Sequence, residues 1–479
     1  MKRVALIHNR ALPIAAIVAT LVALVATRLP HLSTGPLDFD EGVYWLSMRS
    51  MRAGNSLFTS VYSSQPPAFL QVTEPPWDWL GGSIEAGRAV ILAWSVVGVG
   101  AGAVLGWCLG GRVVGVATAL LLTIDPRMVD QSITLQADGP ATSLALLSLA
   151  AAALAVTLRS GRWRVVAAVV CGAAMGLGIL TKLFDVGVVP CVVFVLLSGG
   201  HRWRMLGLAA AGMVSVAALI LLPMVDAWPA MWDQAIGLHV STRTLYQGIS
   251  GTFLWLFLQT EWPLTALAAV GLLIGWRAGR TAGMVGVIWI AGTMGALVAT
   301  RPVFPHHMVL LTPGLAILGG TAIAAIVVEV GARLHDRRWL IPVGLSTAVA
   351  GVVAGALVLS HALTALDAPT NVALVAGLQA LTPASGLLLG DDQYDQALAG
   401  RNAPPQFVDT SGVRLRGEGV TAAALEPVLV ADPRVCGVLF ASGRLSGVPG
   451  FVAWVAQEYP VRHDLPAGAM LYTRTACRP

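Results

Sequence analysis

The stretch PLDFDEGVYWLSMRSMRAGNSLFTSVYSSQPP, residues 36–67, is the longest polar interruption in the first half of a very apolar chain. It follows an apolar run at residues 11–26, so Asp38, Asp40 and Glu41 come just after a predicted membrane span, at the level of the lipid headgroups. Ionisable groups at that depth are costly and tend to be kept for a function. We therefore take this stretch as the first candidate for a functional site.

Within this stretch, residues 40–52 have the pattern of a short helix that ends near Gly54. At helical spacing Asp40, Tyr44 and Ser47 share one face, and apolar side chains form the other side. Such a helix lies along a membrane surface, where it would hold a carboxylate at the boundary between water and lipid. The alternative is an ordinary acidic loop in which the carboxylate only caps the helix.

The rest of the chain has the composition of a polytopic helical membrane protein. Hydrophobic residues make up 56% of the chain and charged residues only 11%, whereas about a quarter of a soluble chain is charged. The first apolar run has no small-x-small cleavage site after it, so we expect it to remain as a helix. No block of Lys and Arg resembles a nucleic-acid footprint, which excludes nucleic acid as a partner. Apolar runs predict about 11 transmembrane helices, at residues 11–26, 89–109, 113–124, 139–158, 165–181, 184–198, 205–223, 253–274, 281–299, 307–329 and 340–362.

The segments between these runs alternate in charge. If the N-terminus is cytoplasmic, every predicted inside loop is basic, as the positive-inside rule requires. The predicted outside segments are acidic, and the longest of them is the first outside loop at residues 30–88. We therefore expect a multi-pass plasma-membrane protein whose acidic loop and C-terminal tail are extracytoplasmic. The basic residues of the inside loops are Arg112, Arg159, Arg162, Arg164, Arg202, Arg204, Arg277, Arg280, Arg333, Arg337 and Arg338.

From about residue 366 the pattern changes to a rhythm of strands and helices. Short apolar runs at residues 386–390, 406–408, 435–440 and 469–472 alternate with helix-like stretches at residues 372–381, 420–429 and 451–458. This pattern predicts a transmembrane domain at residues 1–365 and a small extracytoplasmic α/β domain at residues 366–479.

Several polar residues of this tail have simple structural explanations. Cys436 and Cys477 can pair if the tail is exported, and the sequence leaves that pairing open. We expect the polar residues at the ends of its elements to cap and to face water rather than to touch a substrate. They are Asp391, Asp392, Asp409 and Arg444.

The order and sidedness of five motifs resemble the GT-C superfamily, whose members are polytopic glycosyltransferases that use polyprenyl-phosphate sugars. Within it, the sequence is similar to the protein O-mannosyltransferases and aminoarabinose transferases. The resemblance covers residues 10–330 and leaves the tail out. It is carried by an Asp-Glu-x-x-Tyr pattern (DEGVY, 40–44), a Pro-Pro element (QPP, 65–67), a second acid before Pro (DGP, 138–140), a Gly-rich helix end (GLGILTK, 176–182) and a late His-containing helix start (306–313).

This resemblance implies an inverting transfer with no covalent intermediate on the protein. Two positions depart from the family pattern. The family has Lys before Pro-Pro, where this chain has Gln65, and a basic residue where this chain has Val43. The phosphate of the sugar donor must then be bound by other residues, or the sugar donor differs.

The chemistry of such a transfer requires a base for the acceptor proton and cations or N–H groups for the leaving phosphate. Asp40 is our candidate for the base, because a carboxylate in a partly dry cleft beside another acid has a raised pKa. Glu41 either tunes Asp40 or faces water. Asp138 either assists the base or a metal, or caps the helix that begins at Gly139-Pro140.

The candidates for substrate binding lie at predicted outside ends of helices or in outside loops. Arg suits bidentate phosphate binding, whereas Lys182 can be explained by snorkelling alone. The two histidines lack a third ligand in the sequence, so we predict no metal site. No cofactor is indicated, and the sequence leaves open whether a divalent cation assists. The candidates are Tyr44, Gln65, Lys182, Arg243, Arg301, His306 and His307.

Taken together, these patterns predict a GT-C type hexosyl- or pentosyltransferase. It would move a sugar from a polyprenyl-phosphate donor to a glycan, lipid or protein acceptor of the cell envelope, on the extracytoplasmic side. Two alternatives stay open. A transporter or lipid flippase would favour repeated, broken helices and a site near the middle of the membrane. A non-enzymatic scaffold for envelope assembly is compatible with the departure at Gln65.

Overall fold

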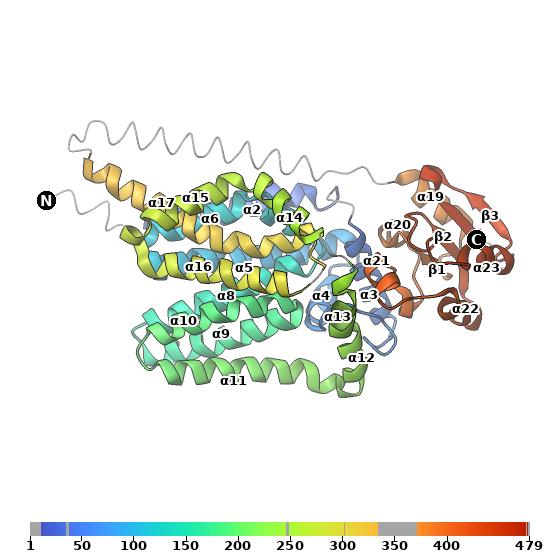
Figure 1. Cartoon of the computed structure of the whole chain (residues 1–479), viewed down its shortest axis with the longest axis horizontal. Helices are drawn as coiled ribbons and strands as arrows, with labels where there is room; N and C mark the ends of the chain where they lie inside the picture. The colour runs from blue at the N-terminus through green and yellow to red at the C-terminus, as the bar shows by residue number, and fades with distance from the viewer. Residues whose placement is uncertain are drawn as a thin grey trace.

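The computed structural model describes residues 11–34, 38–245, 249–300, 302–333, 371–475 and 477. Its long helices form one bundle, and a small α/β domain packs against one end of that bundle (Figure 1). Short helices lie between the two parts, namely α3 (Phe39–Arg52), α4 (Ala68–Trp79), α12 (Trp228–Trp232) and α13 (Leu238–Ser241). The predicted fold class, a polytopic helical membrane protein with a small α/β domain, is confirmed.

The bundle contains seven described helices that are long and apolar enough to cross a membrane, or eight if one bent pair counts as a span. The bent pair is α14 (Ile249–Thr260) and α15 (Trp262–Ile274), whose axes differ by 83°. The predicted run at residues 340–362 lies outside the described residues. The other bundle elements are α2 (Ala11–Arg28), α5 (Ile84–Gly110), α6 (Arg112–Ile124), α7 (Pro126–Gln131), α8 (Asp138–Thr157), α9 (Gly161–Thr181), η2 (Leu183–Val188), α10 (Val189–Ser198), α11 (Arg202–Leu221), α16 (Trp276–Ala299), η6 (Pro305–Leu311) and α17 (Thr312–Arg333).

Two predicted runs, at residues 113–124 and 184–198, form shorter apolar helices. Helix α6 has 13 residues, which is about 20 Å at 1.5 Å per residue, against a hydrocarbon core about 30 Å thick. These two segments are therefore apolar helices, as expected, but are too short to cross a bilayer alone.

Helix α8 lies at the core of the bundle, packed against α5 and α9. It is almost entirely buried and consists mainly of Ala, Ser, Gly and Leu. Small side chains let neighbouring helices approach closely, which explains why this helix is the most enclosed of the described spans. The helix begins at Asp138 and contacts η6, which includes His306 and His307.

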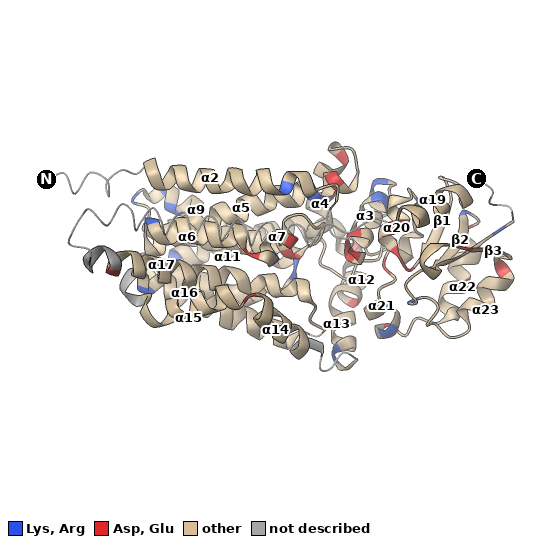
Figure 2. Ribbon diagram, turned by 90° about the horizontal axis from the view of Figure 1, so that it is seen from above, with Lys and Arg blue, Asp and Glu red and all other residues tan. Residues whose placement is uncertain are grey.

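Charge is distributed unevenly along the bundle. Figure 2 shows a group of Lys and Arg at the end of the bundle away from the α/β domain, whereas most Asp and Glu of the bundle lie where it meets that domain, together with further Lys and Arg. This is the asymmetry that the alternating loops predict.

The α/β domain contains a four-stranded sheet in the order β1-β2-β4-β3. β1 (Leu387–Gly390) is parallel to β2 (Val435–Phe440), and β4 (Met470–Thr473) is antiparallel to both β2 and β3 (Val461–Asp464). Cys436 and Cys477 form a disulfide. The helices of the α/β domain are α19 (Val372–Leu381), α20 (Gln393–Leu398), α21 (Gly412–Gly417), α22 (Ala422–Ala431) and α23 (Phe451–Glu458).

The strand predicted at residues 406–408 is wrong. Residues 406 and 407 belong to a 3-10 turn, η7 (Pro405–Phe407), and Val408 follows it. The turn begins at a proline, which fixes φ near the helical value and lacks the backbone donor that a ladder would need. The edge strand β3 was not predicted, because its exposed sequence VRHD lacks an apolar pattern.

Candidate functional site

A cavity of about 540 Å³ lies where the bundle meets the α/β domain. The membrane part lines it with α3, residues 62–66, Leu70 of α4, residues 182–184, residues 235–243, residues 299–300 and residues 302–307. Residues 409–413 and Arg444 of the α/β domain complete the lining. Of the predicted site residues, Asp40, Tyr44, Gln65, Lys182, Arg243, His306 and His307 line this cavity.

Asp40 lies in the first turn of α3, and its carboxylate does not cap this helix. The cap is Asp38, whose carboxylate accepts the backbone N–H of Asp40 at 2.7 Å. The exposed 39% of the Asp40 side chain opens onto the cavity, and its Oδ2 lies 4.0 Å from Nε2 of His306. The alternative that the Asp40 carboxylate only caps the helix is therefore wrong.

The surroundings of Asp40 favour its protonated form. Burial raises the pKa of Asp40 to about 8, the nearby carboxylates of Asp38, Asp409 and Asp138 add to the rise, and Lys182 opposes it. A carboxylate with a pKa near the working pH has the property that a general base requires.

Glu41 points away from the cavity and is not among its lining residues. It is fully buried, as is Arg88 of α5, whose Nε and Nη2 donate to the two carboxylate oxygens of Glu41 at 2.9 and 2.7 Å. The backbone N–H of Leu135 donates to Glu41 at 2.6 Å, and Arg88 also donates to the Tyr394 hydroxyl at 3.1 Å. Glu41 thus ties α3 to the bundle and to the α/β domain, and it does not face water.

Gly42, next to Glu41, brings α3 and α20 into contact. A Cβ atom built on Gly42 would lie 2.2 Å from the backbone N of Tyr394. Only glycine permits this approach, so the sequence Asp40-Glu41-Gly42 fixes the α/β domain directly against the turn that carries Asp40.

Asp138 is buried and pairs with Lys182, whose Nζ donates to Oδ2 of Asp138 at 3.0 Å. The N-cap of α8 is Ala137, which makes no side-chain capping bond, so the explanation of Asp138 as a helix cap is wrong. Lys182 does not snorkel either, because only 5% of its side chain is exposed and its ammonium group is held by Asp138.

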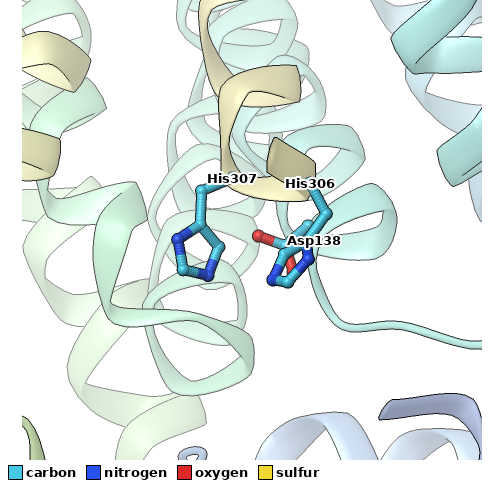
Figure 3. Close-up of side chains that lie close together, drawn as sticks. All are labelled: Asp138, His306 and His307. Atoms are coloured by element: carbon cyan, nitrogen blue, oxygen red, sulfur yellow. The ribbon is translucent and has the colours of Figure 1, made fainter. Parts of the chain in front are cut away.

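His306 and His307 begin η6 at the edge of the cavity, and Figure 3 shows Asp138 beside them. The two rings meet edge to face, with centroids 4.4 Å apart. The backbone N–H of Phe304 donates to Nδ1 of His307 at 3.1 Å. One ligating atom from each of Asp138, His306 and His307 lies within 4.8 Å of the others, so the fold supplies the third residue that the sequence alone did not.

In the arrangement that the structure describes, this triad offers a metal ion an incomplete set of ligands. Lys182 occupies Oδ2 of Asp138 with a positive charge, whereas Oδ1 of Asp138 is buried and has no hydrogen-bond partner among the described residues. His307 uses the lone pair of Nδ1 to accept from Phe304, and a neutral imidazole then carries its proton on Nε2, which leaves no nitrogen lone pair for a metal.

The other predicted residues have simpler surroundings. Tyr44 packs edge to face on Phe69, with ring centroids 4.7 Å apart. Gln65 lines the cavity beside Ser63, and Arg243 lines it from an exposed turn. Arg301 lies outside the described residues.

The tail contributes residues that the sequence did not assign to the site. Asp409 and Arg444 line the cavity, and the guanidinium of Arg444 lies 3.9 Å from the ring centroid of Phe39, next to Asp40. Asp391 and Asp392 have the structural roles that were expected: Asp391 accepts backbone N–H groups after β2, and Asp392 caps α20. Asp409 and Arg444 come from loops, and no local pattern distinguishes them from capping residues.

Comparisons with known proteins found a family match over part of the chain and several solved structures of similar fold. Residues 80–228 match the family "Dolichyl-phosphate-mannose-protein mannosyltransferase". No curated protein matches the sequence. The fold is similar to that of ArnT from Cupriavidus metallidurans bound to undecaprenyl phosphate, with a TM-score of 0.69, 17% identity, and coverage of 96% of this chain and 98% of ArnT.

Two structures of the Archaeoglobus fulgidus oligosaccharyltransferase are also similar. The complex with Zn and sulfate has a TM-score of 0.57 and 15% identity over 96% of this chain and 73% of that one. The complex of AglB with an inhibitory peptide and a dolichol-phosphate has a TM-score of 0.57 and 12% identity over 97% of this chain and 74% of that one. The resemblance to the GT-C superfamily of membrane glycosyltransferases is thereby confirmed.

Proposed function

We propose that this chain, which has the fold of the GT-C membrane glycosyltransferases, transfers a hexosyl or pentosyl group from a polyprenyl-phosphate donor to a cell-envelope acceptor. The observation that carries this proposal is the position of Asp40. Its carboxylate opens into a cavity lined by Lys182, Arg243, His306 and His307. A base and a set of cations and N–H groups thus face the same space, which is what displacement of a phosphate by a hydroxyl or an amine requires.

The proposed step is a single inverting displacement. The acceptor O–H or N–H gives its proton to Asp40, the acceptor atom bonds to the anomeric carbon, and the bond from that carbon to the phosphate oxygen breaks. The electron pair of the broken bond stays on the phosphate, whose charge the cavity side chains stabilise. The lipids bound in two similar structures, undecaprenyl phosphate in ArnT and a dolichol-phosphate in AglB, support a lipid-linked sugar donor.

Membranes that contain this chain test the proposal directly. When they are given radiolabelled polyprenyl-phosphate hexoses or pentoses, we expect at least one sugar to pass into a glycan, lipid or protein fraction. Membranes that lack the chain are the control. Incorporation from nucleotide sugars with none from any lipid-linked sugar would contradict the proposal.

We further propose that the cavity and the α/β domain are extracytoplasmic and that the N-terminus is cytoplasmic. The Cys436–Cys477 disulfide supports this sidedness, because disulfides persist in oxidising compartments. The basic end of the bundle away from the α/β domain (Figure 2) supports it as well.

Reporter fusions measure this sidedness. A reporter that is active only outside the cytoplasm is expected to be active when fused to residue 479 and inactive when fused in the loop near Arg159. The reversed pattern would show that the membrane orientation is the opposite.

A further inference from the structure

We infer that the bundle binds an anionic phospholipid at its end away from the substrate cavity. One acyl chain would lie in an apolar groove between α5, α8 and α9, and the headgroup phosphate would lie against Arg159 and Arg162. This lipid site is separate from the proposed transfer reaction and would exist whether or not the protein transfers a sugar.

The groove has a volume of about 350 Å³ and is lined by Val, Leu, Ala, Gly and Trp alone. Small residues keep it open, because Gly100 of α5 lines it opposite Ala150 and Ala151 of α8. It opens toward the outside of three helices that are long and apolar enough to cross a membrane, so its natural filling is hydrocarbon. The exposed lining residues are Val97, Val104, Val166 and Val170.

One end of this groove meets a positively charged loop between α8 and α9. Leu158 and Trp163 belong to the lining, and the exposed Arg159 and Arg162 are next to them in the chain. The guanidinium of Arg162 lies 5.8 Å from the ring centroid of Trp163, so the charge adjoins the groove. Residues 157–164 contain no acid, and a negative headgroup is therefore the complement of this end.

The charged end is far from the substrate cavity. Helix α9 begins at Gly161, and the residue that follows it is Lys182 of the cavity lining. Its 21 residues span about 30 Å, the thickness of the hydrocarbon core. The phospholipid would therefore belong to the leaflet opposite the cavity, which is the cytoplasmic leaflet in the orientation proposed above.

The arginines of the loop differ in what they contact. Arg164 donates to the backbone carbonyls of Ala155 and Gly200 at 2.8 and 2.9 Å, so it joins this loop to the loop before α11. The guanidinium groups of Arg159 and Arg162 make no hydrogen bond or ion pair with another described residue. Arg164 thus has a structural role, and the other two are free to bind a phosphate.

A second Arg-Trp-Arg sequence strengthens the match to a membrane surface. It begins α11 at residues 202–204, and the guanidinium of Arg202 lies 5.8 Å from the ring centroid of the exposed Trp203. Trp at the interface and Arg that reaches anionic headgroups are the residues that hold a protein to such a surface. A second copy of this chain fits the groove less well, because a symmetric contact would bring like-charged arginines together.

Native mass spectrometry of the purified full-length protein in detergent tests this inference. The protein would be titrated with phosphatidylglycerol, with phosphatidylcholine of the same acyl chains, and with glycerol phosphate, which has a charged phosphate and no acyl chain. Arg162→Gln and the double variant with Arg159→Gln remove charge at the groove. Arg280→Gln is the matched control, because this exposed arginine of α16 lies outside the groove lining.

A further variant blocks the groove itself. A Cβ atom built on Gly100 meets only the side chain of Leu21, at 4.0 Å, so Gly100→Leu places a larger side chain where the acyl chain would lie. The arginine variants change exposed side chains and keep the test decisive if Gly100→Leu does not fold. An unchanged melting temperature would show that each variant is folded.

We expect the wild type to bind phosphatidylglycerol more tightly than phosphatidylcholine and to bind glycerol phosphate weakly. Arg162→Gln should weaken binding of phosphatidylglycerol by about fivefold and the double variant by about 30-fold, after which both lipids should bind about equally. Arg280→Gln should bind as the wild type does. Gly100→Leu should weaken binding of both lipids by about tenfold, the effect of about two methylene groups that are no longer buried.

Four results would overturn the inference. They are equal binding of the two lipids by the wild type, unchanged binding in the double arginine variant, glycerol phosphate bound as tightly as phosphatidylglycerol, and a dimer of the chain that Gly100→Leu dissociates. Each of them leaves the proposed transfer reaction untouched, because none of the substituted residues lines the substrate cavity.

Discussion

Replacing Asp40 by Asn is expected to reduce sugar transfer by about 10²- to 10⁴-fold, the range typical of a lost general base. Asn has the same shape and cannot accept the proton. The Asp40 side chain makes no hydrogen bond to another described residue and only approaches His306 at 4.0 Å, while the cap of α3 is made by Asp38. The fold should therefore survive, and the loss should lie in turnover, measured as transfer from a polyprenyl-phosphate sugar.

Glu85 supplies the matched control for this variant. It is an exposed acid in the first turn of α5 and lies outside the cavity lining. Glu85→Gln removes one negative charge from the same side of the protein and should leave transfer unchanged. Equal activity of Asp40→Asn and Glu85→Gln would show that the carboxylate at position 40 is not the base.

Replacing Arg88 by Met should destabilise the protein by about 3–5 kcal/mol, the usual cost of leaving one member of a buried ion pair without its partner. Both side chains are fully buried, and Arg88 donates twice to Glu41. The loss should appear as a lower midpoint in thermal or denaturant unfolding. The substitution Arg88→Met should also weaken the contact between α3 and the α/β domain, because Arg88 donates to the Tyr394 hydroxyl as well.

A double variant distinguishes two roles for Glu41. Glu41→Gln combined with Arg88→Met removes both charges and keeps an oxygen that can accept from Leu135. We expect it to be more stable than Arg88→Met alone. We also expect it to transfer sugar better than Arg88→Met, because Glu41 lies outside the cavity lining and acts by positioning α3. A double variant that is stable but inactive would assign Glu41 a direct part in the reaction.

Much of the fold follows from local patterns in the sequence. The apolar runs within the described residues correspond to helices, and the helices predicted at residues 372–381 and 451–458 match α19 and α23 at both ends. Periodicity and capping act within a few turns of chain, so they can be detected without knowledge of distant contacts. The missed edge strand β3 has exposed polar residues and pairs through its backbone, which leaves no apolar pattern.

The candidate site was predictable in its members and not in its pairings. Asp40, Lys182 and the two histidines were singled out by residue type and sidedness. Two contacts depend on how α8, α9 and η6 pack. Lys182 donates to Asp138, and Asp138 lies beside His306. Contacts between residues far apart in the chain depend on the whole fold, and for this reason both Asp138 and Lys182 had local explanations that the structure contradicts.

The contacts that the α/β domain makes with the candidate site were even harder to predict from the sequence. Arg444 reaches Phe39 across the interface between the two parts of the chain, and Asp409 joins the cavity from a loop. The one local sign of this interface is Gly42, a helix-weakening residue in the middle of the acidic motif. The need for glycine at this position is explained only by the structure, in which the backbone of Tyr394 packs against Gly42.

The most direct test of the central claim is the pH dependence of kcat/KM for transfer, which reports the essential groups of the free enzyme. A base acts in its deprotonated form, and burial raises the pKa of Asp40 to about 8. Activity should therefore rise about tenfold per pH unit below that value and level off above it. A profile that is flat between about pH 6 and about pH 9, in a protein that stays folded throughout, would contradict the assignment of Asp40 as the base.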